Sequence, residues 1–120
     1  MAGQNLKGFA RLYAAFINSL AGVRATWHHE EAFRQECWLT LAGVPLGLWL
    51  GETGIERALL VGVLINVLIV ELLNTAVEVT IDRIGIERNN LSGRAKDIGS
   101  AAVLSSLVLA GSVWFLILIR

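Results

Sequence analysis

Residues Ala58 to Asp82 decide the fold of this chain and read ALLVGVLINVLIVELLNTAVEVTID. The first half of the stretch is apolar except for Asn66, which is the pattern of a helix in lipid. The second half carries acidic and amide side chains every three or four residues, namely Glu71, Asn74, Glu78 and Asp82. A helix turns by about 100° per residue, so these four side chains occupy an arc of roughly 80° on one face. Ionisable groups near lipid are expensive to bury, and this carboxylate stripe is therefore the first candidate for function.

Two further stretches are apolar enough to be considered as membrane spans. Ile98 to Ile119 is a run of 22 residues without a charge, which crosses roughly 30 Å of hydrocarbon at about 1.5 Å per residue. Cys37 to Leu50 is uncharged over only 14 residues, so it spans the membrane only if its helix extends upstream past Arg34. The hydrophobic fraction of 55% also exceeds that of ordinary soluble domains.

The N-terminal region has the spacing of an amphipathic surface helix. Lys7 and Arg11 lie on one face, and apolar residues recur on another: Phe9, Leu12, Tyr13, Phe16, Ile17, Leu20 and Val23. Such a helix lies in the membrane interface, where its cations either bind phosphates or simply anchor the chain. We predict one all-α membrane domain over residues 1–120, with a surface helix at about 6–27 and three membrane helices at about 30–51, 55–84 and 93–119.

The charged residues balance in number but not in position. Ten basic and ten acidic residues leave no net charge, which gives no indication of a nucleic-acid partner. Only Arg57 and Arg120 fall on one side of the predicted spans, and the other eight basic residues fall on the opposite side: Lys7, Arg11, Arg24, Arg34, Arg83, Arg88, Arg94 and Lys96. The positive-inside rule therefore predicts that the N-terminus and the 82–97 loop are cytoplasmic.

Small residues mark the faces on which the predicted helices pack. They recur at intervals of three or four in the first and last spans: Gly43, Gly47 and Gly51, then Gly99, Ala102, Ser106 and Ala110. Small residues let helix backbones approach closely in a membrane, so we expect packing and not catalysis from both sets. Ser92 is the expected N-cap of the last helix, which places Lys96 and Asp97 near its positive end.

The depth of the carboxylate stripe favours chemistry at the membrane surface. If the helix enters the bilayer near Ile55, Glu71 lies roughly 24 Å and Glu78 roughly 35 Å along it, against about 30 Å of hydrocarbon. Carboxylates at that boundary reach both a lipid headgroup and a soluble substrate. Together with Glu30 and Lys96 they suit Mg²⁺ and phosphate, because Mg²⁺ is held by one or two carboxylates plus phosphate oxygens. The sequence contains no G-x-x-x-x-G-K-[ST] loop and no H-R-D or D-F-G segment.

Several of these residues also have a purely structural interpretation. Glu78 and Asp82 are alternatively exposed helix-end charges paired with Arg83 or Lys96. Glu36 is interpreted as solvated or paired with Arg34. The tryptophans lie near predicted span boundaries and are expected to form an aromatic belt: Trp27, Trp38, Trp49 and Trp114.

Three segments resemble a known family. They are EEAFRQE (Glu30 to Glu36), IVELLNTAVEVTIDRIG (Ile69 to Gly85) and LSGRAKDIGSAAV (Leu91 to Val103). These segments look like the prokaryotic integral-membrane diacylglycerol kinases, and the resemblance covers nearly the whole chain. It implies a homotrimer of three-span subunits in the bacterial inner membrane, with active sites shared between neighbouring subunits at the cytoplasmic face. It also implies transfer of the γ-phosphate of MgATP to the hydroxyl of diacylglycerol, which yields phosphatidic acid.

The resemblance assigns roles to individual residues by motif. Glu71 corresponds to the general base, and Glu30 and Glu78 correspond to the Mg²⁺ ligands. ATP and its phosphates are assigned to Arg11, Glu30, Asn74, Glu78, Lys96 and Asp97. The lipid substrate is assigned to Arg11, Glu71 and Asn74. Asn66 lies outside the motif, and we expect it to form a hydrogen bond between helices.

Two other functions fit the sequence. Undecaprenol kinases of the same family share the E-L-x-N-T-A-x-E segment and phosphorylate a polyisoprenoid alcohol. The segments SGRAKDIGSAAV and AFRQE look more like the diacylglycerol branch. A non-enzymatic membrane subunit that conducts protons or supports a larger complex is the second alternative, and the depth of the carboxylates speaks against it.

Overall fold

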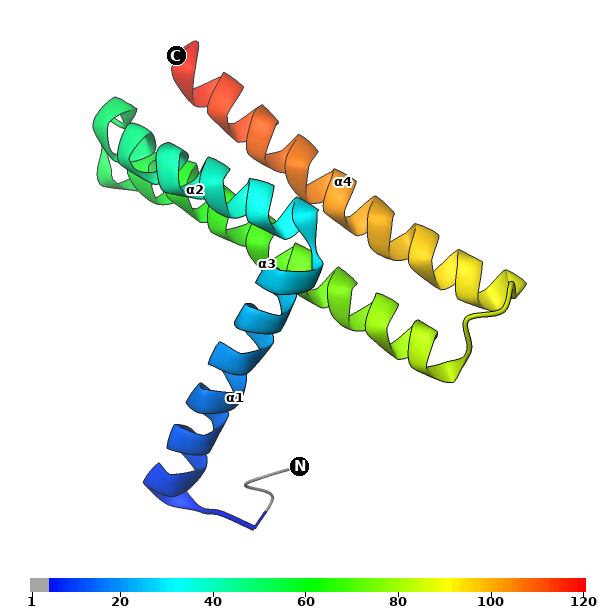
Figure 1. The fold of residues 1–120 in the computed structure, drawn as a ribbon. Coiled ribbons are helices and arrows are strands. Elements are labelled where there is room, and N and C mark those ends of the chain that lie inside the picture. The colour runs from blue at the N-terminus through cyan, green and yellow to red at the C-terminus, as the bar shows by residue number, and fades with distance from the viewer. Residues whose placement is uncertain (1–4) are drawn as a thin grey trace.

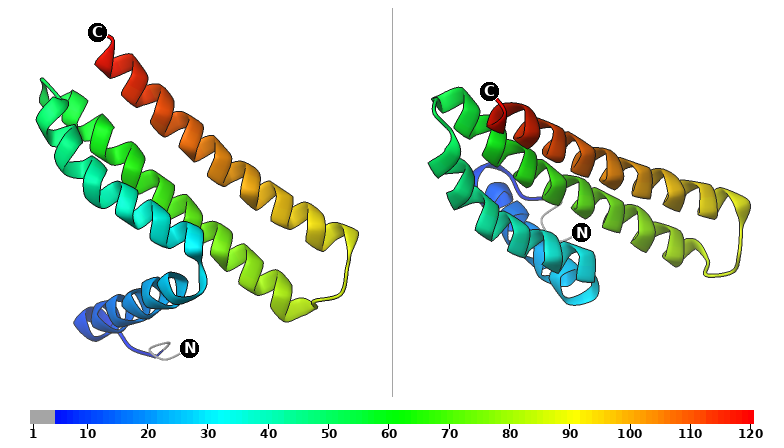
Figure 2. Two further views of the ribbon diagram at one scale, coloured as in Figure 1. Left: turned by 45° about the horizontal axis from the view of Figure 1, so that its top comes forward. Right: turned by 90° about the horizontal axis from the view of Figure 1, so that it is seen from above.

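The computed structural model describes residues 5–120, which form four α-helices joined by short connections (Figure 1). The helices are α1 (Gly8–His29), α2 (Glu31–Leu50), α3 (Gly54–Ile84) and α4 (Asn90–Leu118). Helices α2 and α4 both pack along α3, whereas α1 projects away from this bundle (Figures 1 and 2). Helices α3 and α4 extend beyond the α1–α2 junction, so the polar half of α3 continues past the start of α2. The all-helical expectation is therefore confirmed for the described residues.

Side-chain caps decide where two of the helices begin. The Thr53 hydroxyl accepts a hydrogen bond from the Glu56 amide at 3.1 Å and starts α3. The Asn89 side chain accepts from the Leu91 and Ser92 amides at 2.8 and 3.2 Å. The predicted N-cap at Ser92 is therefore wrong, and α4 begins about one turn earlier than expected because Asn89 satisfies its first amides.

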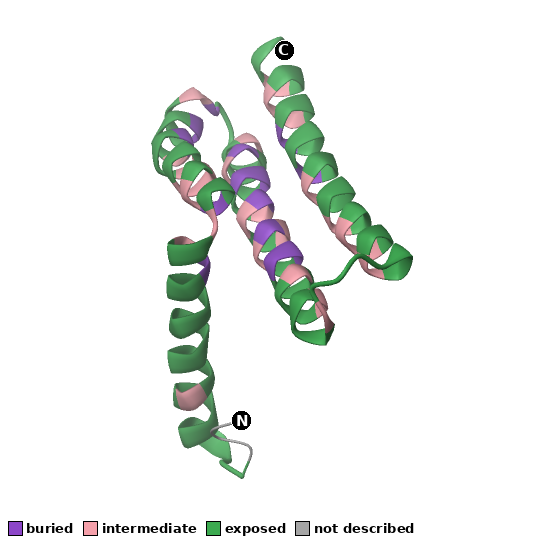
Figure 3. Cartoon of the chain, turned by 45° about the vertical axis from the view of Figure 1, so that its right-hand side comes forward, coloured by how far each residue is buried: buried purple, intermediate pink, exposed green. Residues whose placement is uncertain are grey.

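Helix α3 supplies half of the buried residues of the described chain, more than any other helix (Figure 3). Its buried face contains Leu60, Val63, Leu64, Val67, Glu71, Asn74 and Thr75. In α1, by contrast, Thr26 alone is buried. The apolar core therefore continues without interruption into the polar residues of the carboxylate stripe.

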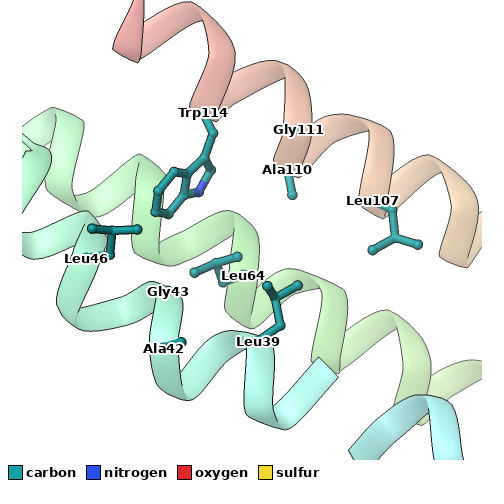
Figure 4. Close-up of a pocket in the computed structure, with 9 residues that line it drawn as sticks. All are labelled: Leu39, Ala42, Gly43, Leu46, Leu64, Leu107, Ala110, Gly111 and Trp114. Atoms are coloured by element: carbon teal, nitrogen blue, oxygen red, sulfur yellow. The ribbon is translucent and has the colours of Figure 1, made fainter. Parts of the chain in front are cut away.

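The glycines of α2 pack against α3, as the sequence predicts. Gly43 lies against the Leu64 side chain, and Gly47 lies against Leu60 and Trp114. The Trp114 indole crosses from α4 to donate a hydrogen bond to the Leu60 carbonyl at 3.1 Å. Trp114 therefore contributes to helix packing, and the aromatic belt stays a prediction. An apolar groove of about 390 Å³ lies beside Trp114 between α2, α3 and α4 (Figure 4).

Two of the helices, α3 and α4, are long and apolar enough to cross a membrane. Many of their apolar side chains are exposed, including Ile65, Ile69, Leu104 and Val108, as expected for surfaces in contact with lipid or other helices. Helix α2 has 20 residues, which corresponds to about 30 Å, but it does not meet the same criterion of length and hydropathy that α3 and α4 meet. A third crossing by α2 stays a prediction.

Candidate active site

Glu71 lies at the centre of the carboxylate stripe and is only 5% exposed. Its carboxyl group is within hydrogen-bonding range of the Glu36 carboxyl group on α2. Two carboxyl groups hydrogen-bond to each other only when one of them carries a proton. The pair can therefore hold a proton at the point where α2 meets α3.

Glu36 is a site residue that sequence reasoning missed. Its expected partner Arg34 instead donates hydrogen bonds to the carbonyl oxygens of Trp27 and His28, at 2.6 and 3.3 Å. Glu36 Oε2 is buried without a hydrogen-bond partner in residues 5–120. The sequence did contain an indication of this position. Glu36 precedes Gly43 by seven residues, so it lies on the same face of α2 as the glycines that pack on α3.

Asn74 lies between Glu71 and Glu78 on α3 and hydrogen-bonds to Glu78. Its Nδ2 donates to Glu78 Oε1 at 3.1 Å, which fixes the orientation of the Glu78 carboxylate. Asn74 Oδ1 is buried and has no hydrogen-bond partner within the described residues. This oxygen lies against Gly99 of α4, where an added Cβ would overlap it. Gly99 therefore has a role at the site that its membership in a small-residue stripe did not reveal.

Glu30 forms the junction between α1 and α2 and is half-buried. Its backbone amide donates to the Thr26 carbonyl at 2.8 Å, which holds the junction in place. Glu30 and Glu78 both act electrostatically on the Glu71 carboxylate, so the structure brings all three together. A cavity of about 600 Å³ between α1 and α3 adjoins Glu30 and is lined partly by Thr26, His29 and Thr75.

Lys96 stands at the end of the stripe and pairs with Asp82. Its Nζ lies 2.7 Å from Asp82 Oδ1, which confirms the sequence-based alternative that Asp82 forms an ion pair. Lys96 precedes the uncharged run of α4, and its hydrogen bond to Asp82 raises the pKa of the ammonium group. Asp97 follows it on α4 and is exposed. A polar cavity of about 160 Å³ adjoins Lys96 between the end of α3 and the start of α4.

Arg11 is a predicted site residue that lies far from the predicted carboxylates within one chain. It is exposed on the first turn of α1, whose opposite end carries Glu30. The 1.5 Å rise of an α-helix separates the two residues by roughly 28 Å along α1. Arg11 therefore does not converge with Glu30 within one chain, and α1 projects away from the bundle that α2, α3 and α4 form (Figure 2).

The donor groups present suit Mg²⁺. Within residues 5–120, no group of three histidine, cysteine or acidic side chains forms a ready metal site. Mg²⁺ needs fewer protein ligands than three, because it keeps several waters and binds one or two carboxylates together with substrate phosphates. Glu30 and Glu78 both lie near Glu71 and supply carboxylates. The residues therefore fit a metal that arrives with a nucleotide phosphate.

The geometry defines an all-helical membrane protein whose carboxylate cluster surrounds one buried member, Glu71. A family model described as prokaryotic diacylglycerol kinase matches residues 17–118. A diacylglycerol kinase of Escherichia coli K12 is 46% identical over 114 residues, which cover 95% of this chain and 93% of that protein. The Haemophilus influenzae diacylglycerol kinase is 47% identical over 107 residues, covering 89% and 91% of the two chains. The Pseudomonas aeruginosa diacylglycerol kinase is 43% identical over 112 residues, covering 93% and 91%.

The chain belongs to the prokaryotic diacylglycerol kinase family. It is accordingly an enzyme of the lipid kinase class, and the interpretation as a non-enzymatic membrane subunit is set aside. The resemblance noted in three sequence segments is confirmed over nearly the whole chain.

Proposed function

We propose that the protein transfers the γ-phosphate of MgATP to the hydroxyl group of diacylglycerol and thereby forms phosphatidic acid. The observation that carries the proposal is the buried Glu71 carboxyl group, which contacts Glu36 and has Glu30 and Glu78 nearby. The family relationship supports the reaction, and the carboxylates fit the metal and the proton transfer that it needs.

Glu71 acts as the general base for the lipid hydroxyl. A hydroxyl group is a weak acid, so a positioned carboxylate assists by accepting its proton during phosphoryl transfer. Glu36 lies close enough to share that proton, which makes it a positioning residue for the base. Most of the rate still comes from alignment and charge neutralisation, since phosphoryl transfer needs little covalent help from the protein.

Glu30 and Glu78 hold Mg²⁺, and Asn74 orients Glu78 through its hydrogen bond. The metal supplies neutralisation of the charge on the transferring phosphoryl group. Lys96 and Asp97 serve the nucleotide at the start of α4, where amide groups and the helix dipole also favour anions. Binding of ATP in this way requires Lys96 to leave Asp82 or to bind phosphate and Asp82 together.

The active sites are shared between subunits of a homotrimer. Arg11 lies far from Glu30 within one chain, so a neighbouring subunit must supply Arg11 if it contacts the same lipid and nucleotide. The proposed site faces the cytoplasm from the inner membrane, where ATP is present. This orientation is supported by the excess of basic residues on that side of the predicted spans.

Phosphate transfer from γ-labelled ATP in mixed micelles tests the proposed reaction. We expect label in phosphatidic acid when diacylglycerol is offered, no label when Mg²⁺ is removed with a chelator, and restored activity when it is added back. Undecaprenol offered separately is the control for the related acceptor. Label only in the polyprenol contradicts the proposed substrate, and label in neither lipid contradicts the proposed reaction.

A further inference from the structure

A single residue, Glu30, separates α1 from α2. Helix α1 ends at His29 and α2 begins at Glu31, and the Glu30 backbone between them is extended, with φ −120° and ψ 109°. The residues on either side keep helical dihedral angles, so the angle between the two helices depends on the dihedral angles of Glu30. Glu30 is also a proposed Mg²⁺ ligand. Any contact that fixes this junction therefore also places one carboxylate of the site.

The Arg34 guanidinium group bridges the junction. Its Nη1 donates hydrogen bonds to the Trp27 carbonyl at 2.6 Å and to the His28 carbonyl at 3.3 Å. The last carbonyl groups of a helix have no partner inside the helix, and a basic side chain satisfies them at the negative end of the helix dipole. Trp27 and His28 precede Glu30 on α1, whereas Arg34 follows it on α2. The side chain therefore ties the two helices together across the residue that joins them.

Arg34 does not neutralise the acidic residues near it in the sequence. It follows Glu30 by four residues and Glu31 by three, which are the spacings at which opposite charges usually meet on a helix. Within residues 5–120, however, Arg34 takes part in no ion pair. Its hydrogen bonds to the carbonyl groups of α1 hold the guanidinium group in another position. The negative charge of Glu30 is therefore not cancelled by the arginine one turn away, which favours binding of a cation.

Few other contacts fix the direction of α1. Thr26 is its one buried residue, and the Thr26 carbonyl accepts a hydrogen bond from the Glu30 amide at 2.8 Å. The Trp27 and Trp38 rings pack edge to face, with centroids 6.1 Å apart and an interplanar angle of 65°. Most of the other side chains of α1 are exposed, and the helix projects away from the bundle (Figure 2). The direction of α1 is therefore set mainly at the junction, where Arg34 makes two of the contacts.

We propose that Arg34 is a positioning residue, which ties the end of α1 to α2 and thereby holds the Glu30 carboxylate near Glu71 and Glu78. A group that orients a metal ligand affects metal affinity without contacting the metal. The inference rests on the proposed function in its use of Glu30 as a Mg²⁺ ligand. The tie between the two helices does not depend on that function.

Distance measurement between two nitroxide labels tests the tie without any turnover. In a Cys37→Ser background, Ala21→Cys on α1 and Leu41→Cys on α2 carry the labels, since both positions are exposed. An excess of unlabelled copies restricts the measurement to pairs within one chain. Arg34→Met removes the donors and the charge but keeps an unbranched side chain. Arg24→Met is the matched control, because it removes an exposed arginine from α1.

We expect a narrow distance distribution for the wild type and for Arg24→Met, and a broader or displaced one for Arg34→Met. Arg34→Lys keeps a charge and a donor but lacks the planar fork of N–H groups, so its distribution should lie between the two. A distribution in Arg34→Met that equals the wild type overturns the proposed tie, whatever the activity of the variant.

The Mg²⁺ dependence of phosphate transfer tests the consequence for the site. We expect Arg34→Met to need about 10- to 100-fold more Mg²⁺ for half-maximal activity, the usual cost of losing a group that orients a metal ligand. Saturating Mg²⁺ should restore most of kcat, whereas a misfolded fraction lowers kcat without changing the Mg²⁺ requirement. Arg34→Lys should have an intermediate requirement, and Arg24→Met should match the wild type.

The two measurements separate failure of this inference from failure of the proposed function. A changed distance in Arg34→Met with a wild-type Mg²⁺ requirement overturns the link between Arg34 and the metal. A wild type that forms no phosphatidic acid contradicts the proposed function, and the distance measurement then still decides whether Arg34 ties α1 to α2.

Discussion

The two ends of the helical bundle both contain acidic residues, but only at one end do these residues form ion pairs with arginine. At the Arg120 end, which comprises Leu48 to Arg57 and Arg120, each charged side chain has a hydrogen-bonding partner. At the carboxylate end, which comprises Glu30, Glu36, Glu71 and Glu78, no side chain forms an ion pair within residues 5–120. The one lysine nearby, Lys96, is bound to Asp82.

Arg120 holds its end of the bundle together with one guanidinium group. It contacts Glu52 at 2.9 Å and Glu56 at 3.1 Å, and it donates to the Leu50 carbonyl at 3.1 Å. Arg57 donates to the Leu48 carbonyl at 3.1 Å, near the last turn of α2. These contacts join the end of α4 to the connection between α2 and α3.

The difference between the ends separates a structural use of charge from a functional one. Paired groups at the Arg120 end have their charges satisfied by the protein itself. At the carboxylate end no basic side chain neutralises these carboxylates within residues 5–120, so they repel one another and favour a cation. Such an arrangement lowers stability, and natural proteins retain it mainly where the site is used.

Removal of the central carboxylate should give the largest effect on activity. We expect Glu71→Gln to reduce kcat by about 10²- to 10⁴-fold, the usual contribution of a general base. The amide is nearly isosteric and can donate a hydrogen bond to Glu36, so we expect a melting temperature at or above that of the wild type. Glu31→Gln, an exposed change beside Glu30, is the control. Wild-type kcat in Glu71→Gln contradicts the base role, and a large drop in melting temperature contradicts the comparison between the ends.

The contact between Glu36 and Glu71 should affect kcat to different extents in two Glu36 variants. We expect Glu36→Ala to lower kcat by roughly 10- to 150-fold, because hydrogen bonds to charged groups contribute about 1.5–3 kcal/mol. Glu36→Gln keeps a hydrogen-bond donor toward Glu71 and should retain more activity than Glu36→Ala. Steady-state kinetics with both substrates varied distinguish this role from a change in binding. Equal activity of Glu36→Ala and the wild type shows that the pairing has no part in the reaction.

A smaller effect is expected where α4 touches the site. Gly99→Ala introduces a methyl group that overlaps Asn74 Oδ1, so we expect the free energy of unfolding to fall by about 1–3 kcal/mol, the usual cost of overpacking, and kcat to fall because Asn74 must shift. Gly111→Ala on the same helix is the matched control, since a Cβ there meets nothing within 4 Å. Equal activities of the two variants indicate that Asn74 does not need its present position.

The smallest effect on activity is expected at the opposite end. Arg120→Ala should lower the free energy of unfolding by about 1 kcal/mol, since partly exposed ion pairs contribute little, and should leave kcat unchanged. Arg24→Ala, which removes an exposed charge from α1, controls for net charge. Thermal denaturation in micelles, followed together with activity, measures both quantities. A marked loss of kcat in folded Arg120→Ala contradicts the purely structural role of this end.

Much of the site was visible in the sequence because helical periodicity is local. Glu71, Asn74 and Glu78 follow the three- and four-residue spacing, and the structure buries Glu71 and Asn74 and leaves Glu78 half-buried. Glu36 was interpreted as solvated or paired with Arg34, because Arg34 is the basic residue near it in the sequence. Its place at the site depends on which face of α2 meets α3, and that is a property of packing.

The sequence by itself determined the helices, the apolar stretches of α3 and α4, and the stripe of acidic and amide residues, since each follows from composition and from a period of 3.6 residues. Only the tertiary structure decided that Glu36 meets Glu71, that Gly99 lies against Asn74, and that Arg120 is bound by Glu52 and Glu56. The physical reason is the separation in sequence of the residues that interact. Helix formation depends on neighbours within one or two turns, whereas these contacts join residues distant in the chain and exist only once the helices have packed in one register.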